Sequence, residues 1–350
     1  MKQVFYIVLI LALAGLGGVF GWKYFQSKNT GVKNTPKTNE VVKKTSFLWG
    51  AVVRPSGLGK YHISIWNKEL ALAQKLGVGW VRLTWDNTSA QNDEIVKAVW
   101  DNGMDVLLVV EPKSFDQLQL STAKDEGYNT LKPIVQKYKG KIRFYQPLNE
   151  IASTVLRGGE FSGEQESDYD QAKYKKAVAW VKGATKAIRE NDSNAKVILT
   201  DQWTHFAFFD MIKKDKVDYD YLGWNWFSDM GFLGDKKITS GEKVFDKLKA
   251  IGKPIILTEV NYRPDDIKGQ PEAKQADFIE DMANFAAENN NVIKGFFVHE
   301  LLDVTNSPKK KLEYYGIVKA EKSKSGTYIP GEPKAAYERY QEVIKKYASQ

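Results

Sequence analysis

The chain of 350 residues contains no cysteine, which excludes disulfide bonds, thiolate metal sites and a cysteine nucleophile but does not decide the compartment. Histidine is also scarce, because only His62, His205 and His299 are present. We therefore expect no multi-histidine metal site. No Gly-x-Gly-x-x-Gly or Walker-type phosphate loop occurs, so a nucleotide-dependent enzyme is disfavoured and no cofactor is expected.

An excess of positive charge is largely missing from the main part of the chain. The net charge is +8, but residues 1–45 hold seven lysines and one glutamate, which leaves only +2 for the rest. A phosphate-binding face is therefore not expected, and we predict no nucleic-acid partner. The composition, with 43% hydrophobic and 27% charged residues, is that of a globular protein.

A long hydrophobic run occurs near the N-terminus, where nineteen residues from Val4 to Trp22 carry no charge. An α-helix of that length roughly spans a hydrocarbon core of about 30 Å. We expect residues 1–26 to be an uncleaved signal anchor; a cleaved signal peptide and a buried core helix are the alternatives. Residues 27–45 are polar and lysine-rich, which favours a flexible linker. The expected location is the cell membrane, single-pass with the folded domain outside, or secretion if the segment is cleaved.

The remainder, 46–350, alternates short apolar runs with amphipathic stretches. Continuous apolar strands between amphipathic helices predict a parallel sheet covered by helices. Eight such units favour one (β/α)₈ TIM barrel, expected to be monomeric, over an open doubly wound sheet. The predicted strands are 47–53, 79–85, 105–111, 142–149, 196–201, 220–227, 254–260 and 293–300.

Two of these strands end in a carboxylate. Asn149 and Glu150 end the fourth strand and Glu259 lies at the end of the seventh. Active sites of such barrels lie where the strands end, so the two glutamates are predicted to face one another. A lone glutamate there is commonly a salt-bridging residue. Two that share a cleft can hydrolyse a glycosidic bond, provided that their environments split their pKa values.

Together with Arg82 in the second strand, these residues resemble the clan A retaining glycoside hydrolases, whose families 5 and 39 have similar layouts. The resemblance implies that Glu150 is the acid/base and Glu259 the nucleophile. It further implies that Asn149 hydrogen-bonds the sugar 2-hydroxyl and that Arg82 keeps the nucleophile ionised.

The sequence departs from the clan pattern in three places. Ile151 follows Glu150 where the clan often has proline. The sixth strand reads Asn225-Trp226-Phe227 where the clan usually has His-x-Tyr, so Tyr262 is a candidate to replace the missing hydroxyl. The eighth strand offers His299 in place of a tryptophan, and we expect His299 to bind the sugar.

Tryptophans near strand ends are candidate platforms for sugar rings, although any one of them can equally be a core residue. The candidates are Trp49, Trp203 and Trp226, with Trp85 and Trp224 nearby. The sequence thus predicts a retaining hydrolase that acts on a β-linked oligo- or polysaccharide. The alternative is a catalytically inactive carbohydrate-binding barrel.

Overall fold

The computed structural model describes residues 47–59, 61–87, 89–158, 161–263, 272–305 and 313–348. The predicted signal segment, 1–26, and the predicted linker, 27–45, lie outside these residues. Within the described ranges, no helix combines the length and the apolar character needed to cross a bilayer.

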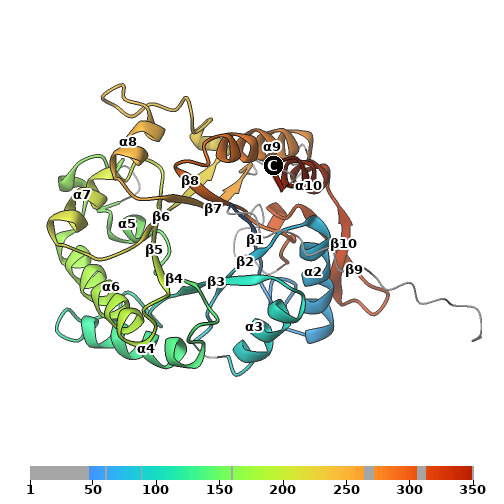
Figure 1. The fold of residues 1–350 in the computed structure, drawn as a ribbon, viewed down its shortest axis with the longest axis horizontal. Helices are drawn as coiled ribbons and strands as arrows, with labels where there is room; N and C mark the ends of the chain where they lie inside the picture. The colour runs from blue at the N-terminus through green and yellow to red at the C-terminus, as the bar shows by residue number, and fades with distance from the viewer. Residues whose placement is uncertain are drawn as a thin grey trace, which may run out of the picture. The chain divides into compact units, whose positions relative to one another are not determined.

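Eight parallel strands close into a barrel in chain order, and β1 pairs with both β2 and β8 (Figure 1). The predicted (β/α)₈ barrel is therefore confirmed, and each strand begins and ends within two residues of its predicted bounds. The strands are β1 (Leu48–Val52), β2 (Trp80–Thr84), β3 (Asp105–Val110), β4 (Phe144–Pro147), β5 (Lys196–Gln202), β6 (Tyr221–Phe227), β7 (Ile255–Asn261) and β8 (Ile293–Val298).

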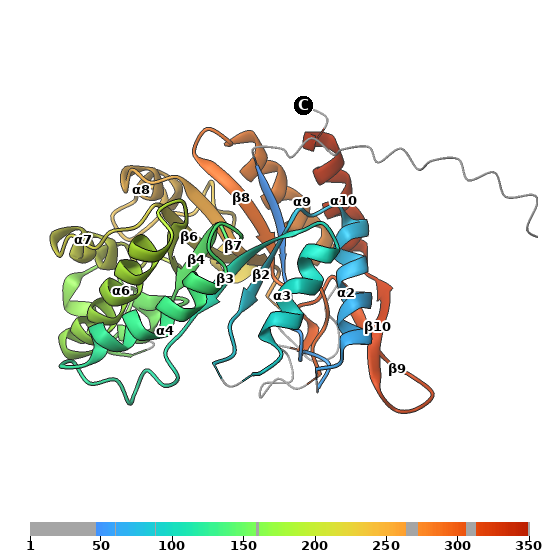
Figure 2. The ribbon, with the colours of Figure 1, turned by 60° about the horizontal axis from the view of Figure 1, so that its bottom comes forward.

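Helices surround the barrel, as the amphipathic stretches predict (Figure 1). They are α2 (Ile63–Leu76), α3 (Asn92–Asp101), α4 (Ala123–Lys137), α5 (Ile151–Val155), α6 (Gln171–Asn191), α7 (Phe206–Lys214), α8 (Val244–Ala250), α9 (Glu272–Glu288) and α10 (Ala335–Ala348). An antiparallel hairpin of β9 (Val318–Lys322) and β10 (Tyr328–Pro333) precedes α10 and lies beside α2 in both views; the sequence did not predict it (Figure 2).

Large side chains fill the barrel interior. Trp80, Phe144 and Tyr221 pack edge to face, with ring centroids 5.2 and 5.3 Å apart. Gly50 of β1 leaves room for the ring of Phe297, because a Cβ there would collide with that ring. The interior is thus a packed core, and the barrel offers a ligand room at the strand ends rather than inside.

The second core layer lies between the strands and the outer helices, and it contains Trp49. This residue is 3% exposed and packs on Phe296 of β8 and on Tyr340 of α10. Its neighbour Leu48 faces the barrel interior, so the alternation of side chains along a strand turns Trp49 outward. Trp49 is therefore a core residue, and the prediction that it serves as a sugar platform is wrong.

Helices α4 and α6 pack unusually closely because each contributes a glycine to their contact. A Cβ on Gly127 would collide with the carbonyl of Trp180, and a Cβ on Gly183 would collide with the carbonyl of Lys124. Each helix therefore presents bare backbone to the other, and both positions require glycine for steric reasons.

Candidate active site

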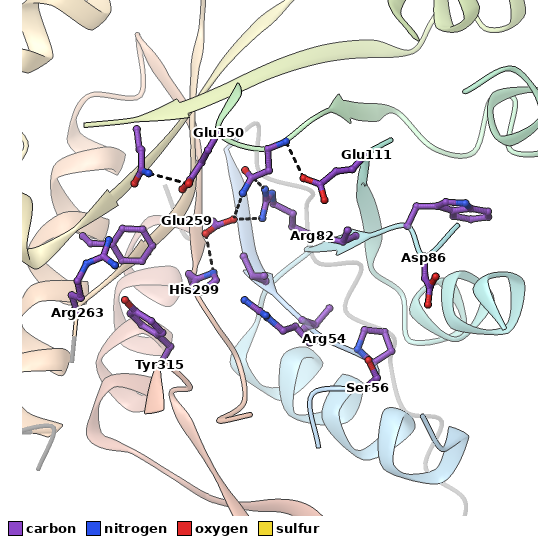
Figure 3. A pocket seen from close by; sticks show the side chains of 18 residues that line it. Arg54, Ser56, Arg82, Asp86, Glu111, Glu150, Glu259, Arg263, His299 and Tyr315 are labelled. Atoms are coloured by element: carbon purple, nitrogen blue, oxygen red, sulfur yellow. Dashed lines mark hydrogen bonds and ion pairs between the residues drawn. The ribbon is translucent and has the colours of Figure 1, made fainter. Parts of the chain in front are cut away.

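A cavity of about 660 Å³ opens at the C-terminal ends of the barrel strands (Figure 3). Its walls include five residues that the sequence predicted for the site: Arg82, Asn149, Glu150, Glu259 and His299. They come from β2, the end of β4, β7 and the end of β8, so the fold brings together side chains as far apart in sequence as Arg82 and His299. The volume falls within the range typical of ligand pockets.

Glu259 reaches the cavity because β7 carries an irregularity. Trp224 of β6 pairs with Leu257, but the next residue, Asn225, pairs with Glu259, so one extra residue is inserted into β7. Thr258 donates a hydrogen bond to Asn225 Oδ1 over 2.7 Å, while Glu259 itself also faces the strand ends. Such a bulge redirects a side chain that strict alternation would turn toward the other face.

Arg82 holds the site together through three hydrogen bonds. Its Nη1 donates to Glu259 Oε1 over 2.6 Å, and its Nη2 donates to Asn149 Oδ1 over 2.8 Å. Its Nε donates to Gln146 Oε1 over 2.9 Å. Arg82 is only 3% exposed, so its charge-assisted hydrogen bond to Glu259 is almost completely shielded from solvent.

The segment that carries Glu150 has an uncommon backbone. Leu148 and Glu150 have φ values of 65° and 48°, in the left-handed region that residues other than glycine rarely adopt. The conformation is held by tertiary contacts, because the amide of Ala152 donates to the buried carboxylate of Asp201. Left-handed residues of this kind cost about 1–3 kcal/mol each and cluster at functional sites.

The carboxylate of Glu150 accepts two hydrogen bonds from neighbouring strands. Gln202 Nε2 donates to its Oε2 and Asn225 Nδ2 donates to its Oε1, each over 2.9 Å. Asn225 Nδ2 also lies 3.4 Å from Asn149 Oδ1, and Asn149 Nδ2 lies 3.4 Å from Glu259 Oε1. Two amide side chains therefore connect the two glutamates.

The surroundings of the two glutamates move their pKa values in opposite directions. Burial, together with the nearby negative charge of Glu259, raises the pKa of Glu150 to about 7. Burial also acts to raise the pKa of Glu259, but the adjacent His299 and the guanidinium of Arg82 together hold it below its ordinary value. Near neutral pH one carboxyl group can thus carry a proton while the other is ionised.

His299 lies against the second oxygen of Glu259. Its Nδ1 is 3.1 Å from Glu259 Oε2, without the alignment of a hydrogen bond. Burial lowers the pKa of His299 to about 4, so its ring is neutral at pH 7. The guanidinium groups of Arg82 and Arg54 are therefore the permanent positive charges that help to keep Glu259 ionised.

Four other residues that the sequence predicted for the site do not line this cavity: Trp203, Asn225, Trp226 and Tyr262. Asn225 acts on the site through its hydrogen bond to Glu150. Trp226 is fully buried, donates from Nε1 to the carbonyl of Gly231 over 2.7 Å and stacks on Trp203. Tyr262 packs against Phe278 of α9. The structure thus does not bring Tyr262 to the position of the hydroxyl that Phe227 lacks.

A tyrosine that the sequence did not single out occupies the wall instead. Tyr315 packs edge-on against His299, with centroids 5.2 Å apart, and against Phe227 at 5.7 Å. Its hydroxyl is buried and has no hydrogen-bond partner among the described residues. Tyr315 lies in the connection after β8, where no strand-end pattern marks it.

Two further carboxyl groups lie close by. Glu111, at the end of β3, lines the cavity and accepts a hydrogen bond from the amide of Asn149 over 3.3 Å. Glu300, the residue after His299, is buried, and its Oε2 lies 2.6 Å from Nε of Arg54, which lines the cavity. Burial raises the pKa of Glu300 to about 7. Within the described residues, no group of three or more histidine, aspartate or glutamate side chains is arranged to hold a metal ion.

No protein-family model matches this chain, and none of the curated proteins matches it. Its fold is similar to solved structures of a β-glucosidase from Thermotoga maritima. The structure described as a family 1 β-glucosidase is 15% identical with a TM-score of 0.62, and the complex with noeuromycin is 15% identical with a TM-score of 0.64. Each similarity covers 87% of this chain and 98% of that one. At this level of identity the likeness is one of fold: a closed (β/α)₈ barrel of the kind found in these β-glucosidases.

Proposed function

We propose that the protein is a retaining glycoside hydrolase that cleaves β-glycosidic bonds of an oligo- or polysaccharide. The observation that carries the proposal is the pair Glu150 and Glu259 in one cavity, with the pKa of the first raised to about 7 and that of the second lowered. Glycosidases of this class need one protonated and one ionised carboxyl group at the same bond. The fold shared with β-glucosidases supports the same proposal.

In the first step, a carboxylate oxygen of Glu259 attacks the anomeric carbon and the bond from that carbon to the leaving oxygen breaks. The leaving oxygen takes the proton of Glu150, so the alcohol departs neutral and the sugar remains as an ester on Glu259. Arg82 and Asn149, which hold Glu259 Oε1, orient the nucleophile for this attack.

In the second step, Glu150 is ionised and removes a proton from water, whose oxygen attacks the anomeric carbon and releases Glu259. Gln202 and Asn225 keep the Glu150 carboxyl group at the same place during both steps. Two displacements at one carbon retain its configuration.

The test uses Glu150→Ala, Glu259→Ala and the matched variant Glu111→Gln, which changes a third carboxyl group of the same cavity. With an aryl β-glycoside that the wild type turns over, Glu259→Ala should abolish hydrolysis, and azide should partly restore the activity of Glu150→Ala as a β-glycosyl azide. Glu111→Gln should retain more activity than either. Unchanged hydrolysis by Glu259→Ala would disprove the assignment.

A catalytically inactive carbohydrate-binding barrel is the second candidate, because Phe227 and His299 replace residues that are usual in the clan. Binding of a saccharide without product release, unaffected by either glutamate substitution, would favour it. A panel of aryl β-glycosides and plant or microbial polysaccharides separates the two candidates and identifies the sugar.

We also propose that residues 1–26 anchor the protein in the cell membrane with the catalytic domain outside. The uncharged run from Val4 to Trp22 and the polar linker that follows it support the proposal. Protease treatment of intact cells should release the domain. If the domain survives this treatment but is digested after the cells are lysed, the domain lies inside the cell and the proposed orientation is wrong.

A further inference from the structure

A buried aspartate and a buried histidine lie next to the segment that carries Glu150. Asp201, in β5, is fully buried, and His205, directly before α7, is 4% exposed. Oδ1 of Asp201 faces Nδ1 of His205. Neither residue lines the catalytic cavity, so neither is placed to contact a substrate there. Burying two ionisable side chains is costly unless their polar atoms find partners, and the partners of this pair lead to Glu150.

Asp201 holds the backbone that follows Glu150. Its Oδ2 accepts a hydrogen bond from the amide of Ala152, and its Oδ1 accepts one from the amide of Gln202 over 2.9 Å. Ala152 lies in α5, which begins directly after Glu150 and packs beside β5 (Figure 1). Glu150 has a φ of 48°, a conformation that tertiary contacts must maintain because residues other than glycine rarely adopt it. The carboxylate of Asp201 is thus one of the contacts that fix where the side chain of Glu150 points.

A second connection links the pair to the carboxyl group of Glu150 through side chains. Gln202 Nε2 donates to Glu150 Oε2 over 2.9 Å and to Ser153 Oγ over 3.1 Å. Ser153 Oγ in turn lies 3.5 Å from His205 Nδ1. The hydroxyl of Ser153 therefore joins the amide that holds Glu150 to the buried histidine.

The loop from 161 to 170 closes over His205. Gly163 in this loop has a φ of 78°, and a Cβ there would lie 2.5 Å from Cδ2 of His205. The amide of Gly163 donates to Asp168 Oδ2 over 3.0 Å, and its carbonyl accepts from the hydroxyl of Tyr169 over 2.8 Å. Asp168 and Tyr169 are the titratable groups that this loop brings close to the pair. The loop places bare backbone against the imidazole ring, so the ring is held against Asp201 and almost shielded from solvent.

The pair also contributes charge to the site. Burial is the main cause of the raised pKa of Glu150, and the negative charges of Glu259 and Asp201 add to it. The hydrogen bond from Asn225 and the charge of Arg82 act in the opposite direction on this pKa. Loss of the charge on Asp201 should therefore favour the ionised form of Glu150.

We infer that Asp201 and His205 are positioning residues for the general acid. Asp201 fixes the backbone after Glu150, and His205, together with Ser153, fixes the amide of Gln202 that holds the carboxyl group. This role rests on the proposed function, in which Glu150 is the acid. Loss of either residue should therefore reduce catalysis mainly where the leaving group needs a proton.

The test measures kcat/KM of Asp201→Asn and His205→Leu with an alkyl β-glycoside and with the 2,4-dinitrophenyl glycoside of the same sugar. The alkyl glycoside needs the proton of Glu150, so its kcat/KM should fall about 10- to 100-fold, the cost of a misplaced catalytic group. The dinitrophenyl glycoside needs no proton, so its kcat/KM should stay within about threefold of the wild type. In Asp201→Asn the alkaline limb of the pH profile should also move to lower pH. His205→Asn, whose amide can donate from the position of Nδ1, should retain most of the activity towards the alkyl glycoside.

The matched control is Asp192→Asn. Asp192 is also a buried aspartate, 3% exposed, and it accepts hydrogen bonds from the amides of Gly140 and Asn194 over 2.8 and 3.1 Å, but it does not line the cavity. Asp192→Asn should leave the ratio of the two kcat/KM values and the alkaline limb unchanged, even where its melting temperature falls. Should Asp201→Asn or His205→Leu fail to fold, Ser153→Ala, at a half-buried position, tests the same connection by the same ratio.

An equal loss on both glycosides, or no loss on either, overturns the inference and makes the pair a structural one. If the wild type hydrolyses no glycoside, the proposed function fails, and carbon NMR titration of the Glu150 carboxyl group, assigned with Glu150→Gln, then decides whether the pair acts on Glu150. A lower midpoint in Asp201→Asn but not in Asp192→Asn supports this action; equal midpoints in the wild type and Asp201→Asn overturn it.

Discussion

The difference between the pKa values of Glu150 and Glu259 predicts how the rate of hydrolysis depends on pH. The first step needs Glu150 protonated and Glu259 ionised in the free enzyme. Because the pKa of Glu150 is raised to about 7, kcat/KM should fall as the pH rises through about 7. Because the pKa of Glu259 is lowered, the acidic limb should lie below the ordinary glutamate value of 4.5.

The magnitude follows from the environment of Glu150. At about 1.4 kcal/mol per pH unit, the difference between 4.5 and about 7 corresponds to about 3 kcal/mol in favour of the protonated form. Burial is the largest cause, and the charge of Glu259 adds to it. Without this shift, a carboxyl group would be almost fully ionised at pH 7 and the acid would be missing.

The assay is the pH profile of kcat/KM for the wild type and for Glu150→Gln, with two leaving groups. A 2,4-dinitrophenyl glycoside needs no proton from the enzyme, so the variant should retain kcat/KM within about tenfold of the wild type, without the alkaline limb. An alkyl glycoside needs the acid, and its kcat/KM should fall by about 10²–10⁴.

Glu300 is a second candidate for the carboxyl group that causes the alkaline limb. The pKa of Glu300 is also raised to about 7, by burial, and Glu300 pairs with Arg54 at the cavity wall. Glu300→Gln should keep the alkaline limb if Glu150 is the acid. An alkaline limb that persists in Glu150→Gln and disappears in Glu300→Gln would refute the reasoning.

Four further predictions follow from particular contacts. Stability should change with pH, because the raised pKa of Glu150 stabilises the fold fully below pH 4.5 and this contribution is lost as the pH rises through about 7. Between these pH values, the free energy of unfolding of the wild type should fall by up to about 3 kcal/mol more than that of Glu150→Gln. Equal pH dependence in the two proteins would contradict this. Arg82→Met leaves Glu259 buried without its partner, so urea denaturation should show a loss of about 3–5 kcal/mol, and a stable variant would argue against the pairing. Gly183→Ala should cost about 1–3 kcal/mol by forcing α4 and α6 apart, and an unchanged urea midpoint would mean that the helices can separate freely. Tyr315→Phe should lower kcat at an unchanged melting temperature, because Tyr315 lines the cavity and its hydroxyl has no hydrogen-bond partner among the described residues; an unaltered kcat would mean that the side chain serves packing alone.

The barrel could be predicted because its signal is local and repeated eight times. Apolar runs such as 105–111 and 254–260 have the length and composition of buried parallel strands, and each is followed by an amphipathic stretch. The hairpin of β9 and β10 escaped prediction because its residues are mostly exposed or half-buried, so no clear hydrophobic pattern marks them.

Only part of the candidate site could be predicted from the sequence. Glu150 and Glu259 were found because strand ends in a barrel converge, whatever their separation along the chain. Trp49 was misjudged because a strand-end tryptophan faces either the mouth or the outer helices, and packing on α10 decides between the two. Tyr315 was overlooked because it belongs to a connection whose path depends on the whole fold.

The sequence by itself determined the order of strands and helices and the two glutamates at strand ends, because hydrophobic periodicity and strand termini are properties of a short stretch of chain. Only the tertiary structure decided how those glutamates differ. An inserted residue in β7 turns Glu259 toward Arg82, and the left-handed backbone at Glu150 places its carboxyl group between Gln202 and Asn225. Charge and burial act through distances between residues far apart in the chain, so pKa values are set only once the barrel has closed.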